Sequence, residues 1–203
     1  MSNKGKKNKA DLRKFYKEKR SSLEPNIKKE KDLEIQSRFL LTDEYRKCKG
    51  ILVYIARDFE IDTSGIINAA FANKKTVAVP KVNDDYTLSF YKINSKDDLV
   101  IGKFSVCEPK DGLEKITDFD DFVCVTPSLC CDLNGYRLGF GKGCYDRFFA
   151  KFEGKKIALT YSDSIEVAID TYENDIKVDA IVTDSFTKYI CEDTILSKED
   201  NYE

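Results

Sequence analysis

The stretch Ile51-Leu-Val-Tyr-Ile55 is a short apolar run with β-branched members, which is typical of a strand buried on both faces. After it, Asp62 or Thr63 can cap a helix whose apolar positions are Ile66, Ile67, Ala70 and Phe71. A second strand follows over Thr76–Val79, and we expect Pro80 to stop it. Strand, helix and strand in so short a stretch predict a βαβ unit with parallel strands and a right-handed connection.

Two helices are expected before this unit. In the first, Leu12, Phe15, Tyr16, Lys19 and Leu23 follow the helical i, i+3, i+4 spacing. Pro25 can open the second, over about Asn26–Leu41, although the apolar stripe of that helix is thin.

The second half of the chain repeats the alternation of strand and helix. Strands are expected over Phe122–Val125, Lys156–Tyr161 and Ala180–Val182, and a half-exposed strand over residues 86–90. A further helix should contain Tyr145, Phe148 and Phe149. The alternation predicts an α/β three-layer sandwich with a mostly parallel central sheet flanked by helices. In such folds ligands bind at the carboxyl ends of the strands.

Length and composition favour one globular domain over residues 1–203, with residues 1–8 expected to be a flexible basic tail. The chain is 41% hydrophobic and 12% aromatic, which supplies enough apolar material for a core. No apolar run approaches the length of a membrane span, and no apolar stretch of the secretory type follows the first lysines. We therefore expect a cytoplasmic protein that has no membrane partner.

The chain contains no histidine, which excludes Ser-His-Asp triads, Cys-His dyads and histidine-ligated zinc sites. Its seven cysteines contain no Cys-x-x-Cys pair, so a thiolate zinc site is disfavoured as well. We expect these cysteines to be free thiols that are mostly structural.

Residues 1–20 hold nine basic and two acidic side chains, although the whole chain has a net charge of −2. Such an arm could bind nucleic-acid phosphates, or be a solvated start of a helix. A third interpretation is that one or two of its cations reach an anion site on the folded body.

The segment Asp132-Leu-Asn-Gly-Tyr-Arg-Leu-Gly-Phe-Gly-Lys-Gly-Cys-Tyr-Asp-Arg147 lies between a predicted strand and a predicted helix. Gly139, Gly141 and Gly143 lack Cβ atoms, so the backbone can adopt positive φ and direct N–H groups at an anion. Arg137 and Lys142 add positive charge, and the dipole of the next helix points the same way. The spacing fits neither the Walker loop nor the dinucleotide fingerprint. The segment is either a phosphate-binding loop or a tight connection.

Arg137-Leu-Gly-Phe-Gly-Lys-Gly-Cys-Tyr-Asp146 resembles the Arg-Leu-Gly-x-Gly-x-Gly-Tyr-Tyr-Asp signature of the 5-formyltetrahydrofolate cyclo-ligases, also called 5,10-methenyltetrahydrofolate synthetases. The similarity extends to Lys9–Arg13, to Glu60 after the first strand and to Glu173–Asp179 near the C-terminus. Four separated motifs in the family's order therefore cover nearly the whole chain.

The resemblance implies an ATP- and Mg-dependent ring closure of 5-formyltetrahydrofolate to 5,10-methenyltetrahydrofolate, through phosphorylation of the formyl oxygen, by a monomer that binds no nucleic acid. It implies catalytic roles for Arg137, Lys142 and Asp146, and Mg ligands at Asp146 and Asp175. The positions that match the family's ATP contacts are Lys9, Ala10, Asp11, Leu12, Arg13, Arg137, Leu138, Gly139, Phe140, Gly141, Lys142, Gly143, Cys144 and Tyr145. The positions that match its folate contacts are Ile55, Glu60, Phe140, Gly141, Lys142, Gly143 and Cys144.

Each of these residues also has a purely structural interpretation. Lys9 and Arg13 could be helix-surface charges, Asp146 a helix cap and Glu60 a solvated loop residue. The chain departs from the family pattern at Phe140, where Arg or Tyr is frequent, and at Cys144, which replaces the first Tyr. The alternative function is therefore a folate- or nucleotide-binding homologue with impaired catalysis. Cys144, at a helix start beside glycines, could also have a lowered pKa and be sensitive to oxidation.

Overall fold

The computed structural model describes residues 8–102 and 107–190. Its helices are α1 (Lys9–Ser21), α2 (Pro25–Leu41), α3 (Asp43–Lys47), α4 (Ser64–Ala72) and α5 (Cys144–Phe149). The strands of the largest sheet are β1 (Gly50–Val53), β2 (Thr76–Val82), β3 (Leu88–Ile93), β6 (Lys115–Ile116), β7 (Phe122–Pro127), β10 (Lys155–Leu159), β12 (Ala180–Val182) and β13 (Thr187–Tyr189). Two small sheets are formed by β8 (Cys130–Asp132), β9 (Arg137–Leu138) and β11 (Ile165–Glu166), and by β4 (Leu99–Ile101) and β5 (Cys107–Pro109).

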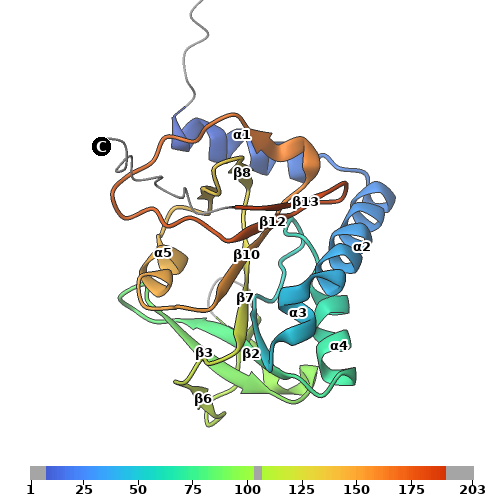
Figure 1. Ribbon diagram of the computed structural model, residues 1–203, viewed down its shortest axis with the longest axis vertical. Coiled ribbons are helices and arrows are strands. Elements are labelled where there is room, and N and C mark those ends of the chain that lie inside the picture. Colours follow the sequence, from blue (N-terminus) through green and yellow to red (C-terminus); the bar gives the residue numbers. More distant parts are fainter. Residues whose placement is uncertain (1–7, 103–106, 191–203) are drawn as a thin grey trace, which may run out of the picture.

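The large sheet has the order β13-β12-β10-β7-β1-β2-β3-β6 (Figure 1). The five strands from β12 to β2 are paired in parallel, and β13, β3 and β6 are antiparallel additions at the two edges. β1, α4 and β2 form the expected βαβ unit. The structure thus confirms an α/β fold with a large, mostly parallel sheet flanked by helices.

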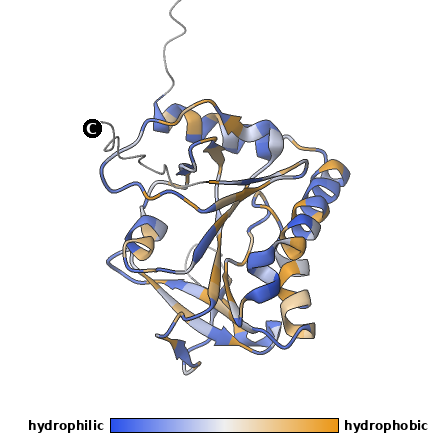
Figure 2. Cartoon of the chain, in the orientation of Figure 1, coloured by the Kyte–Doolittle hydropathy of each residue, from blue (hydrophilic) through white to orange (hydrophobic). Residues whose placement is uncertain are grey.

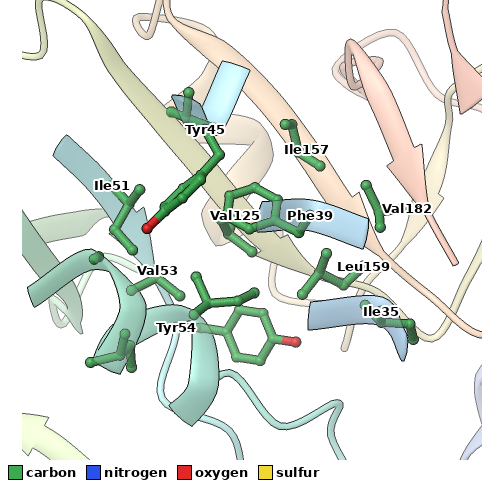
Figure 3. Packing of buried hydrophobic residues seen from close by; sticks show 14 of the residues in the cluster. Ile35, Phe39, Tyr45, Ile51, Val53, Tyr54, Val125, Ile157, Leu159 and Val182 are labelled. Atoms are coloured by element: carbon green, nitrogen blue, oxygen red, sulfur yellow. The ribbon is translucent and has the colours of Figure 1, made fainter. Parts of the chain in front are cut away.

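Alternate residues of the parallel strands face two different cores, as the pleat of a strand requires. Ile51, Val53, Val125 and Leu159 pack against α2, α3 and α4, and Figure 3 shows their contacts with Ile35, Phe39 and Tyr45. The intervening positions, Leu52, Cys124 and Ala158, face Phe149 of α5 and Phe152 on the opposite side. Figure 2 shows the central strand β7 in the hydrophobic colours, as burial on both faces requires.

Helix α1 covers the small β8–β9–β11 sheet, because Leu12 and Tyr16 pack on Leu129, Cys130 and Leu138. Asn8 begins this helix: its side-chain oxygen accepts hydrogen bonds from the backbone N–H groups of Ala10 and Asp11, at 2.9 and 3.0 Å. The expected tail therefore ends before Asn8, and residues 1–7 lie outside the described part of the chain.

Three local expectations were wrong. β2 does not stop at Pro80 but runs on to Val82, because its pairing with β1 has already ended at Ala78 and only β3 accompanies it further. Helix α3 was not predicted; Thr42 caps it by accepting a hydrogen bond from the N–H of Tyr45 at 3.2 Å. Tyr86 belongs to no strand, because it lies in the turn between β2 and β3 with a φ of 61°.

Candidate functional site

A cavity of about 500 Å³ opens at the carboxyl ends of β1 and β7, where the fold class predicts a ligand site. Among the described residues, its lining contains six basic and four acidic side chains, an excess of positive charge in a chain whose net charge is negative. The predicted positions that line it are Lys9, Arg13, Ile55, Glu60, Asp175 and every residue from 137 to 146. The four separated motifs therefore meet at one place.

Three predicted ATP contacts lie elsewhere. Ala10 and Asp11 are exposed on the first turn of α1, and Leu12 is buried in the core beneath that helix. Because consecutive helical residues point in different directions, only Lys9 and Arg13, four apart, share the face turned to the cavity. The structure does not bring Ala10, Asp11 and Leu12 to the site.

The glycine-rich loop, residues 139–143, combines two backbone geometries. Gly141 and Gly143 have φ angles of 102° and 66°, which favour glycine, whereas Gly139 does not have a positive φ. The expectation of positive φ at all three glycines was therefore wrong for Gly139. A Cβ at Gly139 would meet no atom within 4 Å, so this glycine leaves open space in the cavity lining.

Arg13 lies along this loop. Its Nε donates a hydrogen bond to the carbonyl oxygen of Gly139 at 3.0 Å, and a Cβ on Gly141 would lie 3.3 Å from the same Nε. The loop therefore connects α1 to the cavity rather than merely joining β9 to α5. Helix α5 has only six residues, so its dipole contributes less to anion binding than the sequence suggested.

Two ion pairs join the predicted phosphate-binding cations to the predicted metal-binding carboxylates. Arg137 Nη1 lies 3.2 Å from Asp146 Oδ1, and the ammonium group of Lys9 donates to Asp175. The backbone N–H of Ile176 lies 3.4 Å from Asp146 Oδ1, so the segment that carries Asp175 lies against Asp146. The two carboxylates are thus neighbours, as a shared cation would require.

Asp146 is not a helix cap, because Gly143 occupies the N-cap position of α5 and makes no side-chain capping bond. Lys9 is only 9% exposed, which excludes the interpretation of a solvated surface charge. Glu60 is 5% exposed, so it is not a solvated loop residue either. The structural interpretations weighed for these three residues, namely a helix cap, a surface charge and a solvated loop residue, are therefore wrong.

The guanidinium of Arg137 is buried against aromatic rings, 5.7 Å from the centroid of Tyr145 and 4.9 Å from that of Phe149. Among the described residues its Nε and Nη2 have no hydrogen-bond partner, and the Tyr145 hydroxyl has none either. Burial raises the pKa of the Tyr145 hydroxyl, which therefore remains a donor at neutral pH. Buried polar groups without partners at a cavity favour a polar, anionic ligand there.

Sequence reasoning missed Arg57, which lines the cavity and lies against two aromatic rings that contact each other. Its guanidinium is 4.5 Å from the ring centroid of Phe59 and 4.4 Å from that of Phe140. Its Nη2 donates to Glu60 Oε1, and its backbone N–H to Glu60 Oε2, both at 2.9 Å. The Arg-x-x-Glu spacing was a possible signal for this pair, but nothing in the sequence places Phe59 and Phe140 together.

Lys142 lies at the open end of the cavity, with its ammonium 5.0 Å from the ring centroid of Tyr86 in the β2–β3 turn. The carbonyl oxygen of Lys142 accepts a hydrogen bond from Arg147 Nη1 at 2.6 Å. These contacts attach the glycine-rich loop to the β2–β3 turn and to α5. Arg147 and Tyr172, which also line the cavity, were not predicted as site residues.

Cys144 differs from the expectation of a reactive thiolate. Burial raises the pKa of the Cys144 thiol, and the nearby Arg147, which acts in the opposite direction, does not reverse this effect. The hypothesis of a lowered pKa was therefore wrong. Cys48, Cys124, Cys130 and Cys131 are buried, as structural thiols would be, whereas Cys107 is exposed and Cys191 lies outside the described residues.

Basic side chains of α1 contact the folded body, and Lys9 and Arg13 are two of them. Lys19 lies 3.1 Å from Asp163, and the buried Arg20 donates to the carbonyl oxygens of Ser128 and Leu129. Lys9 and Arg13 line the cavity, which fits the interpretation that one or two cations of this segment reach an anion site on the folded body.

Within residues 8–102 and 107–190, no helix has the length and apolar character to cross a membrane. In the same residues no group of three or more cysteine, aspartate or glutamate side chains could hold a metal on its own. Any cation at Asp146 and Asp175 must therefore take further ligands from a bound substrate or water.

Comparisons with known proteins agree with the motifs. Curated relatives include the mitochondrial 5-formyltetrahydrofolate cyclo-ligase of Arabidopsis thaliana, 28% identical and aligned over 88% of this chain and 78% of its own. The cyclo-ligase of Escherichia coli K12 is 24% identical over 84% of this chain and 97% of its own. The solved structure of Aquifex aeolicus 5,10-methenyltetrahydrofolate synthetase is 28% identical, covers 96% of this chain and 99% of its own, and has a TM-score of 0.81.

The sequence profile of the 5-formyltetrahydrofolate cyclo-ligase family matches residues 5–184, a span that includes each segment contributing predicted residues to the cavity. Motif order, fold and profile thus lead to one result: this chain belongs to the 5-formyltetrahydrofolate cyclo-ligase family, whose members are ligases.

Proposed function

We propose that this chain is an ATP- and Mg-dependent enzyme that converts 5-formyltetrahydrofolate to 5,10-methenyltetrahydrofolate and releases ADP and phosphate. Membership in the family supports the activity, and the charge of the cavity supports the use of a polyanionic co-substrate. The proposal includes a single-domain monomer that works in the cytoplasm.

The triphosphate is proposed to lie along the glycine-rich loop. Gly139 leaves space beside the backbone, Arg13 lies along the loop, and Lys142 stands at its open end. Lys9 and Arg137, which pair with Asp175 and Asp146, line the same cavity. This gathering of cations neutralises phosphate charge, which is the principal requirement of phosphoryl transfer.

The residues present fit a magnesium ion. Asp146 and Asp175 offer hard carboxylate oxygens from adjacent segments, and Mg²⁺ commonly takes one or two carboxylates together with phosphate oxygens and water. When bound, the cation would supply charge neutralisation and hold the triphosphate in position. In its absence Lys9 and Arg137 neutralise the same carboxylates.

The chemistry requires no histidine. The formyl oxygen is a poor leaving group, so it first attacks the terminal phosphorus of ATP and displaces ADP. The second folate nitrogen then attacks the activated carbon and loses its proton, and phosphate leaves with the former formyl oxygen. Arg137 and Lys142 stabilise the charge that develops on the transferred phosphoryl group, which agrees with a chain that lacks the usual base.

The folate is proposed to lie on the side of Glu60 and Ile55. Glu60 can accept hydrogen bonds from the pterin amide and amino groups, since each carboxylate oxygen keeps a lone pair beside its bond from Arg57. Phe140 and Phe59 offer aromatic edges nearby, with ring centroids 5.6 Å apart. The replacement of Arg or Tyr by Phe140 thus leaves an aromatic wall in place.

The observation that carries the proposal is the pairing of Arg137 with Asp146 at the cavity, where two further guanidinium nitrogens have no hydrogen-bond partner among the described residues. Its test is Asp146→Asn, which removes the carboxylate charge but keeps the size of the side chain. We expect turnover, followed by the absorbance of the methenyl product, to fall at least about 100-fold, as for loss of a group that stabilises transition-state charge.

The matched control is Asp43→Asn, on the exposed surface of α3 away from the cavity. It should retain full turnover and unfold at the denaturant concentration of the unsubstituted enzyme. Asp146→Asn leaves the buried Arg137 without its charge partner and should unfold at a lower concentration, so its turnover is measured without denaturant on protein shown by circular dichroism to be folded. Near-normal turnover in Asp146→Asn would remove Asp146 from the metal site. Absence of any turnover in the unsubstituted enzyme with ATP, Mg and the formyl folate would favour the impaired binding homologue.

A further inference from the structure

Helix α2 carries a buried stripe of polar side chains. Lys28, Asp32 and Gln36 are spaced four residues apart and therefore lie on one face of the helix. Asp32 and Gln36 are only 3% and 4% exposed. This stripe interrupts the apolar face that a packed helix normally presents. It explains why the apolar pattern of α2 in the sequence is thin.

All three side chains bind the backbone of one segment, residues 60–65. Lys28 Nζ donates to the carbonyl oxygen of Glu60 at 2.7 Å. Asp32 Oδ2 accepts from the N–H of Asp62 at 3.2 Å, and Gln36 Oε1 accepts from the N–H of Gly65 at 2.7 Å. A Cβ on Gly65 would lie 2.4 Å from Gln36 Oε1, so the close approach needs glycine there.

The stripe is itself held in place. Lys28 Nζ donates to Asp32 Oδ2 at 2.6 Å, and the hydroxyl of Tyr161 donates to Asp32 Oδ1 at 2.7 Å. Tyr161 follows β10, so the Asp32 carboxylate is fixed between the sheet and the segment 60–65. A buried carboxylate with this many partners has a single orientation.

The segment that the stripe holds contains the Glu60 of the cavity. Residues 54–63 form neither helix nor strand, so side-chain contacts help to hold them, together with backbone hydrogen bonds such as that from the N–H of Glu60 to the carbonyl oxygen of Arg57 at 2.8 Å. Besides the stripe, the hydroxyl of Tyr54 donates to the carbonyl oxygen of Ile61 at 2.9 Å. Packed apolar residues are often at least as stabilising as buried charge pairs, so stability alone does not account for this stripe.

We propose that Lys28, Asp32 and Gln36 are positioning residues. By holding the backbone of residues 60–65, they fix where the Glu60 carboxylate lies in the cavity and thereby determine the affinity for the formyl folate. This inference rests on the folate role that the proposed function gives to Glu60. None of the three lines the cavity, so they act through the backbone of the segment 60–65.

The test compares Lys28→Met, which removes the donor to the Glu60 carbonyl, with Lys28→Arg, which keeps a donor. Gln36→Met, which removes the acceptor for Gly65, is a second variant in case Lys28→Met fails to fold. Lys31→Met is the matched control, because Lys31 lies on the same helix and pairs with Asp163 and Asp184 instead. Glu60→Gln serves as the reference for loss of the carboxylate charge.

We expect Lys28→Met and Gln36→Met to raise KM for 5-formyltetrahydrofolate about tenfold, the equivalent of one hydrogen bond. The dissociation constant of a non-hydrolysable ATP analogue, measured by calorimetry, should change less than about twofold. Lys28→Arg should restore most of the folate KM, and Lys31→Met should leave it unchanged. The Gly65 amide should exchange hydrogen faster in Gln36→Met, because that variant removes the side-chain oxygen that accepts its hydrogen bond.

The outcomes distinguish the positioning role of the α2 stripe from the folate role of Glu60. A raised folate KM in Glu60→Gln together with an unchanged KM in Lys28→Met and Gln36→Met overturns the positioning role. An equal loss of ATP-analogue affinity in Lys28→Met also overturns it, because a general loosening of the fold would weaken both ligands. An unchanged folate KM in Glu60→Gln instead overturns the folate role of Glu60 in the proposed function.

Discussion

Replacement of Gly139 by alanine separates the structural role of the glycine-rich loop from its proposed binding role. Gly139 does not have a positive φ, and a Cβ built on it meets no atom within 4 Å. Such a Gly→Ala change is tolerated by the backbone and stabilises a protein by about 0.4–1 kcal/mol through the unfolded chain. The fold should therefore be unaffected or slightly more stable.

Ligand affinity should respond in the opposite direction. The methyl group projects into open space at a position that lines the cavity, where the triphosphate is proposed to approach the backbone. Loss of one backbone hydrogen bond to a charged phosphate costs about 1.5–3 kcal/mol. Because about 1.4 kcal/mol corresponds to a tenfold change in Kd, affinity should fall about 10- to 100-fold.

The assay is titration calorimetry of a non-hydrolysable ATP analogue with Mg, with urea unfolding of the same samples. Gly141→Ala is the contrasting variant: its φ of 102° strains any other residue, and its Cβ would lie 3.3 Å from Arg13 Nε. That variant should lose stability by about 1–3 kcal/mol as well as affinity. Unchanged analogue affinity in Gly139→Ala would refute the proposed path of the triphosphate along this loop.

Two further predictions concern buried polar groups. Tyr145→Phe removes a buried hydroxyl that has no partner among the described residues. The free energy of unfolding should therefore stay within about 0.5 kcal/mol of that of the unsubstituted protein, or rise. Because Tyr145 lines the cavity, KM for at least one substrate should increase. A large loss of stability on urea unfolding would show that the hydroxyl has a partner within the protein. For Asp184, burial alone would raise the pKa of the carboxyl, but hydrogen bonds from the Ser162 backbone and hydroxyl and from Lys31 outweigh burial and lower it below 3.8. A lowered pKa in the folded state stabilises the fold above the unfolded pKa, and this stabilisation is lost as pH falls through the folded pKa. Asp184→Asn should therefore have a lower free energy of unfolding than the unsubstituted protein at pH 7, and this difference in free energy should shrink below about pH 4. A difference that does not change with pH in urea titrations would contradict this reasoning.

Local patterns were sufficient where the physical cause was itself local. The βαβ unit followed from an apolar run, a capped helix and a second apolar run, because a parallel strand buried on both faces needs few polar residues. The glycine-rich loop was recognised for the same reason, since glycine spacing and flanking charge are written in consecutive residues. The predicted end of the second strand at Pro80 was wrong. A proline is tolerated in a strand where one neighbouring strand has already ended, and β1 ends its pairing with β2 before Pro80. The residues around Pro80 contain no sign of where β1 ends.

The sequence by itself determined the class of fold, the candidate loop and the family resemblance, because these depend on the order and spacing of residue types. Only the tertiary structure decided which side chains meet: that Lys9 and Arg13 turn to the cavity while Leu12 does not, and that Arg57 packs against both Phe59 and Phe140. The polar stripe of α2 is the clearest case, because the sequence showed only a thin apolar pattern for this helix and did not reveal the stripe. Its partners lie about 30 residues away in the chain, and they become neighbours only when burial of the apolar strands packs the helix against the segment 60–65.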